Sequence, residues 1–216
     1  RFLKRTSLSP TFIHSLYLVP LTYVQFGQIC AGIYKCSKNL QDVVKWQQKA
    51  APMKGAKGND MRWEERYMRR ALELAQEAAE CGEVPVGCVI VLHGEIVGEG
   101  RNRREERQRT SSHAEMEAIE AANARLGSWR LHRCTMYVTL EPCPMCAGGI
   151  INARVDTVRY GTRDDKAGAC GSVLNLFEER FNHHPRLYRG PLERECQEIL
   201  QDFFQGLRED GAGENG

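Results

Sequence analysis

The chain is organised around two short stretches, His113-Ala114-Glu115 and Pro142-Cys143-Pro144-Met145-Cys146. The second carries two thiols three positions apart, on one face of a helical turn, where both can hold one metal ion. The first supplies an imidazole and, two residues later, a carboxylate. One His and two Cys make three ligands, one fewer than a closed structural zinc site uses, whereas catalytic zinc keeps its fourth position for water. Glu115 can then take a proton from that water. The stretches predict a hydrolytic zinc enzyme.

Other interpretations exist for a Cys-x-x-Cys pair alone. In a reducing compartment it is also typical of a redox pair or of half of a four-ligand structural site. A structural site, however, would gain nothing from Glu115. His-x-Glu followed by Pro-Cys-x-x-Cys is the known signature of zinc deaminases, in which the Glu is not a ligand, so this interpretation rests on an established pattern and not on spacing alone.

Length and composition indicate one ordinary domain, or one domain with an appendage. The 216 residues are 42% hydrophobic, enough for a core without a disulfide framework. The nine cysteines are odd in number, which favours a reduced, intracellular protein with mostly buried or incidental thiols. No apolar run reaches the roughly 18 residues of a membrane span. We therefore expect a cytoplasmic protein without a membrane segment.

Charge divides the chain near Met61. Residues 1–60 carry seven Lys and two Arg against two Asp, a net charge of 9 − 2 = +7. The other 156 residues carry 21 basic and 26 acidic groups, 21 − 26 = −5, and Lys166 is their only lysine. This break predicts a basic, poorly ordered extension over 1–60, a zinc deaminase domain over 61–210 and a disordered tail over 211–216.

Two interpretations of residues 1–60 stay open. The basic, acid-poor, serine-containing start is typical of an organellar transit segment, which would change the expected location. The weak amphipathic order of this start favours instead an upstream extension, with Met61 as the natural first residue.

From Met61 onward the hydrophobic pattern predicts alternating helices and strands. Helices are expected over 62–81, 113–126, 142–153 and 192–207, and strands over 85–92, 95–100, 134–140 and 155–160. We expect a hairpin turn at His93-Gly94 and loops over 101–112 and 161–171. The order indicates an α/β fold, one sheet with helices on both faces. It also puts both motif stretches at helix N-termini, where partial positive charge favours thiolates.

Six stretches, 83–87, 98–103, 113–115, 139–148, 160–172 and 195–204, resemble bacterial tRNA-specific adenosine deaminases over about residues 62–208. The resemblance implies a cytidine-deaminase-like, three-layer α/β/α fold with a central mixed sheet, and a homodimer with active sites near the subunit interface. It implies hydrolysis of adenosine to inosine at the wobble position of a tRNA anticodon stem-loop, with one Zn²⁺ per subunit and no organic cofactor. By the same resemblance the zinc ligands are His113, Cys143 and Cys146, the proton shuttle is Glu115, and Asn102 and Asp164 contact substrate.

The sequence also offers candidates for further contacts with RNA. From the residues alone, Asn102 is also an ordinary turn residue. Aromatic stacking on splayed anticodon bases would suit Phe181, Phe203 and Phe204. For the two residues of the terminal helix, core packing is the favoured role. Basic candidates, for which a solvated and self-paired charge run is the alternative, are Arg101, Arg103, Arg104, Arg107, Arg109, His183, His184, Arg186 and Arg189.

Two rival functions share the core motif. A deaminase of free guanine, cytosine or a nucleoside would use the same three ligands and carboxylate, so only the resemblance of the flanking stretches favours tRNA. A non-catalytic partner subunit of a deaminase complex commonly lacks the shuttle carboxylate, and Glu115 argues against it.

Overall fold

The computed structural model describes residues 63–213, and the predicted extension over 1–60 lies outside these residues. No helix of the described part is both long and apolar enough to cross a bilayer. Helix α3, Trp63–Glu80, opens the described part close to the predicted start at 62. The predicted boundaries near 60 and 210 stay predictions.

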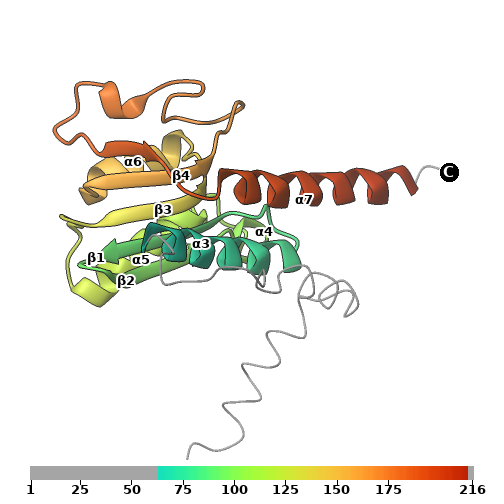
Figure 1. The fold of residues 1–216 in the computed structure, drawn as a ribbon, viewed down its shortest axis with the longest axis horizontal. Helices are drawn as coiled ribbons and strands as arrows, with labels where there is room; N and C mark the ends of the chain where they lie inside the picture. Colours follow the sequence, from blue (N-terminus) through green and yellow to red (C-terminus); the bar gives the residue numbers. More distant parts are fainter. Residues whose placement is uncertain (1–62, 214–216) are drawn as a thin grey trace, which may run out of the picture. The chain divides into compact units, whose positions relative to one another are not determined.

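A five-stranded mixed sheet forms the middle layer, in the order β2-β1-β3-β4-β5 (Figure 1). Neighbours β1/β2 and β1/β3 are antiparallel, whereas β3/β4 and β4/β5 are parallel. The parallel pairs are the reason that the later strands need crossover segments between them. The strands are β1 Gly87–Leu92, β2 Glu95–Arg101, β3 Thr135–Leu140, β4 Thr157–Thr162 and β5 Arg186–Arg189.

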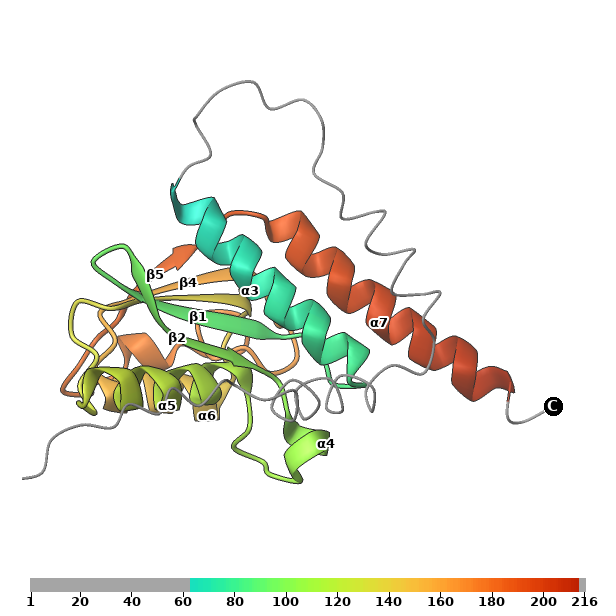
Figure 2. The same ribbon diagram turned by 90° about the horizontal axis from the view of Figure 1, so that it is seen from below.

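Helices cover both faces of this sheet (Figure 2). Helix α3 and helix α7, Glu193–Gly213, lie side by side on one face. Helices α5, Ala114–Leu126, and α6, Pro144–Ala153, lie on the other. Strand β1 serves both layers because successive side chains of a strand point to opposite faces: Cys88 and Ile90 are buried with α5 and α6, Val89 and Val91 with α3. The predicted cytidine-deaminase-like α/β/α architecture is confirmed.

Close packing of α5 on β2 sets the position of the helix start. A Cβ atom at Gly100 would lie 2.2 Å from the carbonyl oxygen of Ala114, and one at Gly98 2.3 Å from that of Ala118. Only glycine therefore lets the helix backbone rest directly on the strand. This contact holds the first turn of α5, which follows His113, against the end of β2.

The predicted turns of this half are also confirmed. His93 has a φ of 51° in the hairpin between β1 and β2. Gly127 caps α5 with a φ of 60° and donates its backbone N–H to the carbonyl oxygen of Asn123. Both residues adopt the left-handed conformation that turns and helix C-caps require.

Four elements differ from the sequence predictions, and one of them is the unpredicted 3-10 helix η1, Leu176–Glu178. The loop 101–112 contains a short helix, α4 Arg104–Arg107. Strand β5 was not predicted. Only Leu187 of its four residues is partly buried, so the sequence there has no alternation of apolar and polar residues long enough to indicate a strand. Helix α7 continues to Gly213, six residues past its predicted end.

The predicted core role of Phe203 and Phe204 is wrong. Phe204 is 43% exposed, and neither residue belongs to the buried clusters. The two rings pack edge to face, 5.5 Å apart between centroids. Cys196 is the buried core residue among residues 193–209 of α7, and Leu192 just before the helix packs against the same cluster. The apolar pattern of an amphipathic helix indicates one shared face, but whether a neighbour covers that face depends on tertiary packing.

Candidate metal centre

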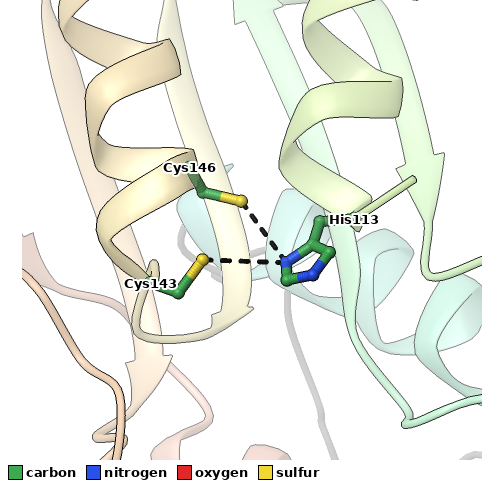
Figure 3. A group of neighbouring side chains, drawn as sticks. All are labelled: His113, Cys143 and Cys146. Atoms are coloured by element: carbon green, nitrogen blue, oxygen red, sulfur yellow. Dashed lines mark hydrogen bonds between the residues drawn. The ribbon is translucent and has the colours of Figure 1, made fainter. Parts of the chain in front are cut away.

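The structure brings His113, Cys143 and Cys146 together from two helix starts (Figure 3). His113 is the N-cap of α5, and Cys143 is the N-cap of α6 with Pro144 in the first turn. His113 Nδ1 lies 3.7 Å from Cys143 Sγ and 3.5 Å from Cys146 Sγ. All three ligand atoms lie within 4.8 Å of one another. The sequence prediction that these stretches meet is confirmed.

The spacing of these atoms fits a single metal ion. In a tetrahedral zinc site, Zn–N and Zn–S bonds place the nitrogen about 3.6 Å from each sulfur. The two measured N···S distances fall on either side of that value. Two thiolates and one imidazole form a soft donor set that suits zinc, and three protein ligands leave a fourth position.

Electrostatics favours a thiolate at Cys143. Its hydrogen bond with the Cys146 thiol, assisted by the contact with His113, lowers the pKa of Cys143 to about 4. The proximity of Cys143, together with burial, raises the pKa of the Cys146 thiol far above its usual range. The contact with Cys143 is also the main cause that raises the pKa of His113. A bound metal cation would let both thiols ionise.

Glu115 lies beside the ligands but is not one of them in this arrangement. Glu115 is only 4% exposed, and its carboxylate lies close enough to the Cys146 thiol to raise the pKa of that thiol. Burial is the main cause that raises the pKa of Glu115. A carboxyl group with a raised pKa can both accept and release a proton near neutral pH.

Asn102 follows β2 and is also buried, with 6% exposure. Its backbone N–H donates to the carbonyl oxygen of Val86 at 3.0 Å, and the next N–H, of Arg103, donates to that of Ser112. The Asn102 side-chain amide has no hydrogen bond to any residue of the described part. A turn role for Asn102 would depend on a hydrogen bond from its side chain to the nearby backbone, and the described structure has none. The side-chain amide can therefore form hydrogen bonds with a ligand.

Asp164 has a different role in the fold. Its Oδ1 accepts the backbone N–H groups of Lys166 and Ala167, both at 3.0 Å, which closes the turn that begins the loop after β4. A substrate contact by Asp164 stays a prediction, and it would have to use the remaining carboxylate oxygen.

A residue that sequence reasoning missed, Glu141, ties this loop to the ligand-bearing segment. Its carboxylate is 2% exposed and accepts the Ser172 hydroxyl and the backbone N–H groups of Ser172, Cys170 and Asp164, at 3.0, 2.9 and 3.3 Å. Burial alone would raise the pKa of Glu141, but these hydrogen bonds outweigh it and hold the pKa below its usual value. Because Cys143 lies two residues away, Glu141 couples the loop to the metal centre.

We expect Glu141→Gln to destabilise the protein by about 3 kcal/mol at neutral pH, because an amide offers one acceptor fewer to a cluster of N–H donors. This lowers the melting temperature by about 6 to 12 °C. The folded pKa lies below the unfolded value of about 4.3, so the stabilisation is present above that pH and is lost as the pH falls through the folded pKa. Denaturant unfolding at pH 7 and pH 3.5 tests this: the difference from wild type should shrink at the lower pH. Glu178→Gln, an exposed change, is the control.

Several of the predicted RNA contacts are already engaged within the fold. His183 Nε2 contacts the carbonyl oxygen of Val155 at 2.7 Å, and His184 Nδ1 that of Phe177 at 3.0 Å. Arg189 pairs with Glu193 and lies over the ring of Tyr160. These contacts favour structural roles, whereas Arg186 and Phe181 remain exposed.

Comparison with known proteins agrees with this geometry. The family model for MafB19-like deaminases matches residues 62–208. The tRNA-specific adenosine deaminase of Bacillus subtilis (strain 168) is 49% identical over 149 residues, 68% of this chain and 92% of that protein. The corresponding enzyme of Streptococcus pyogenes serotype M18 (strain MGAS8232) is 45% identical over 144 residues, 66% of this chain and 91% of that protein.

A solved structure supports the same assignment. It comes from work on A-to-I editing by tRNA:A34 deaminases at the wobble position of transfer RNA. It matches with a TM-score of 0.61 and 42% identity over 63% of this chain and 99% of that chain. The fold, the three converging ligands and these likenesses together show that the chain belongs to the MafB19-like deaminase family and to the tRNA-specific adenosine deaminases.

Proposed function

We propose that the chain catalyses the zinc-dependent hydrolytic deamination of adenosine to inosine at the wobble position of a tRNA anticodon. One observation carries the chemistry: His113, Cys143 and Cys146 converge on one point, with the buried carboxylate of Glu115 beside them. The tRNA substrate is supported by the names and identities of the relatives.

The mechanism assigns each of these residues one task. His113, Cys143 and Cys146 would hold the zinc ion, which when bound acidifies water enough for attack at neutral pH. Glu115 accepts the proton that this water loses as its oxygen adds to C6 of adenine. Glu115 passes that proton to the ring nitrogen. It then takes the second proton, from the new hydroxyl group on C6, and gives it to the departing amine, so that ammonia leaves and inosine remains. Burial of Glu115 keeps bulk water from exchanging with the proton in transit.

Asn102 is proposed to hold the adenine ring through its side-chain amide. We expect Asn102→Ala to raise the KM for the anticodon stem-loop about tenfold, because a ligand loses hydrogen bonds of about 1.5 kcal/mol. The melting temperature should change by less than about 2 °C, since the side chain has no hydrogen bond to lose within the described fold. Steady-state kinetics and thermal unfolding on the same samples check this. A large drop in melting temperature with unchanged KM would support the turn role instead.

The proposal also includes a homodimer and a cytoplasmic location. The seven cysteines of the described part are all free thiols, which suits a reducing compartment. A transit function for residues 1–60 would move the location to an organelle.

Inosine formation by the full-length, zinc-loaded protein tests the proposed function. The substrates are an anticodon stem-loop with adenosine at the wobble position, free adenosine, guanine and cytidine. Inosine in the stem-loop alone is the expected result. Turnover only of a free base or nucleoside would keep the zinc chemistry and reject the tRNA substrate.

A further inference from the structure

The loop that leads into His113 carries five arginines and two glutamates between residues 101 and 109. Three of these arginines are paired. Arg101 and Arg103 share the Glu106 carboxylate at 2.9 and 3.4 Å. Arg107 pairs with Glu117 of α5 at 2.6 Å. Two carboxylates, of Glu106 and Glu117, therefore offset most of the positive charge of these three arginines.

Backbone hydrogen bonds also hold the same loop to the rest of the domain. The backbone N–H of Glu106 donates to Oε1 of Glu83 at 2.8 Å, and the Glu83 side chain is only 1% exposed. The N–H of Arg103 donates to the carbonyl oxygen of Ser112, the residue before His113. These hydrogen bonds hold the loop against Glu83 and against the residue that precedes His113.

The remaining two arginines, Arg104 and Arg109, are exposed and have neither an ion pair nor a side-chain hydrogen bond within residues 63–213. The backbone N–H of Arg109 donates to the carbonyl oxygen of Arg104 at 3.2 Å, which keeps the two residues on one turn. Along the chain, Arg104 lies nine residues before His113 and Arg109 lies four residues before it. Helix α4, which begins with Arg104, lies near the start of α5 (Figure 2).

We propose that Arg104 and Arg109 bind phosphate groups of the RNA strand on either side of the target adenosine, while Arg101, Arg103 and Arg107 hold the loop in shape. The proposal rests on the proposed function. A free guanidinium group binds phosphate without giving up a partner, whereas a paired one must first lose its carboxylate. Since residues 61–216 carry a net charge of −5, attraction of RNA by this part of the chain has to come from such local unpaired charge.

Salt-dependent binding of a labelled anticodon stem-loop to the full-length protein tests this. Each phosphate contact to a single strand contributes about 0.7 to the slope of log affinity against log salt concentration. We expect Arg104→Ala and Arg109→Ala each to reduce the slope by about that amount and to weaken binding about threefold to tenfold near 0.1 M salt. Arg104→Lys keeps the charge and should retain most of the slope.

Two comparisons make the result specific. Arg69→Ala removes an exposed arginine from α3, on the other face of the sheet, and should leave slope and affinity unchanged. Arg101→Ala should lower the melting temperature, which Arg104→Ala should not. The proposal would be overturned if Arg104→Ala and Arg109→Ala both kept the wild-type salt dependence of binding. It would also be overturned if Arg69→Ala lost as much slope and affinity as they do. Inosine formation is measured separately. If the wild-type protein forms no inosine, the proposed function is wrong. If the wild-type protein is active but the arginine variants keep its salt dependence of binding, only this inference is wrong.

Discussion

Replacing Glu115 by glutamine is expected to lower kcat on the stem-loop by about a hundredfold to ten-thousandfold, or more, with zinc content unchanged. Glutamine has almost the same shape, so the buried position beside Cys146 stays filled. It cannot, however, accept the proton of the attacking water or pass one to the leaving amine. Single-turnover inosine formation, with metal analysis of the same preparation, gives both readouts.

The matched control is Glu120→Gln, the same change five residues further along α5. Glu120 is exposed and has neither an ion pair nor a side-chain hydrogen bond within residues 63–213. This variant should keep kcat within about twofold, because a surface substitution away from such contacts usually changes the free energy of unfolding by no more than about 0.5 kcal/mol. Near-full activity of Glu115→Gln would show that another group moves the proton and that the proposed mechanism is wrong.

Removing one ligand, by Cys143→Ala, is expected to release the metal and abolish inosine formation, with a loss of about a thousandfold or more. Activation of water by a metal ion supplies several kcal/mol of transition-state stabilisation, and a factor of one thousand corresponds to about 4 kcal/mol. Two remaining ligands cannot complete the three-ligand catalytic geometry. Native mass spectrometry of the purified protein measures the bound metal directly, independent of activity.

Cys170→Ala provides the control for thiol loss. Cys170 is buried at 2% exposure in the neighbouring loop, and burial raises its pKa above that of a free thiol, so it does not ionise at neutral pH. This variant should retain zinc and most of its activity. Zinc retained at wild-type level by Cys143→Ala would contradict the assignment of this residue as a ligand.

Much of the site was predictable because its information is local. Cys143 and Cys146 are neighbours on one helical turn, and His113 and Glu115 on another, so residue type and spacing already define the donor set. The continuous apolar run of β1 likewise indicates a strand that is buried on both faces of the sheet. Gly98 and Gly100 mark the close approach of α5 to β2. Each of these signals lies within a few residues, which is the range over which backbone periodicity carries information.

What only the tertiary structure decided involves partners far apart in sequence. Glu141 accepts N–H groups from residues 23 to 31 positions later, and Glu83 holds an amide 23 positions away. No periodicity predicts which buried carboxylate meets which loop, because the pairing depends on how the crossovers return to the sheet. The same holds for the five loop arginines, which are chemically equivalent in sequence. Only folding gives three of them a carboxylate and leaves Arg104 and Arg109 for another molecule.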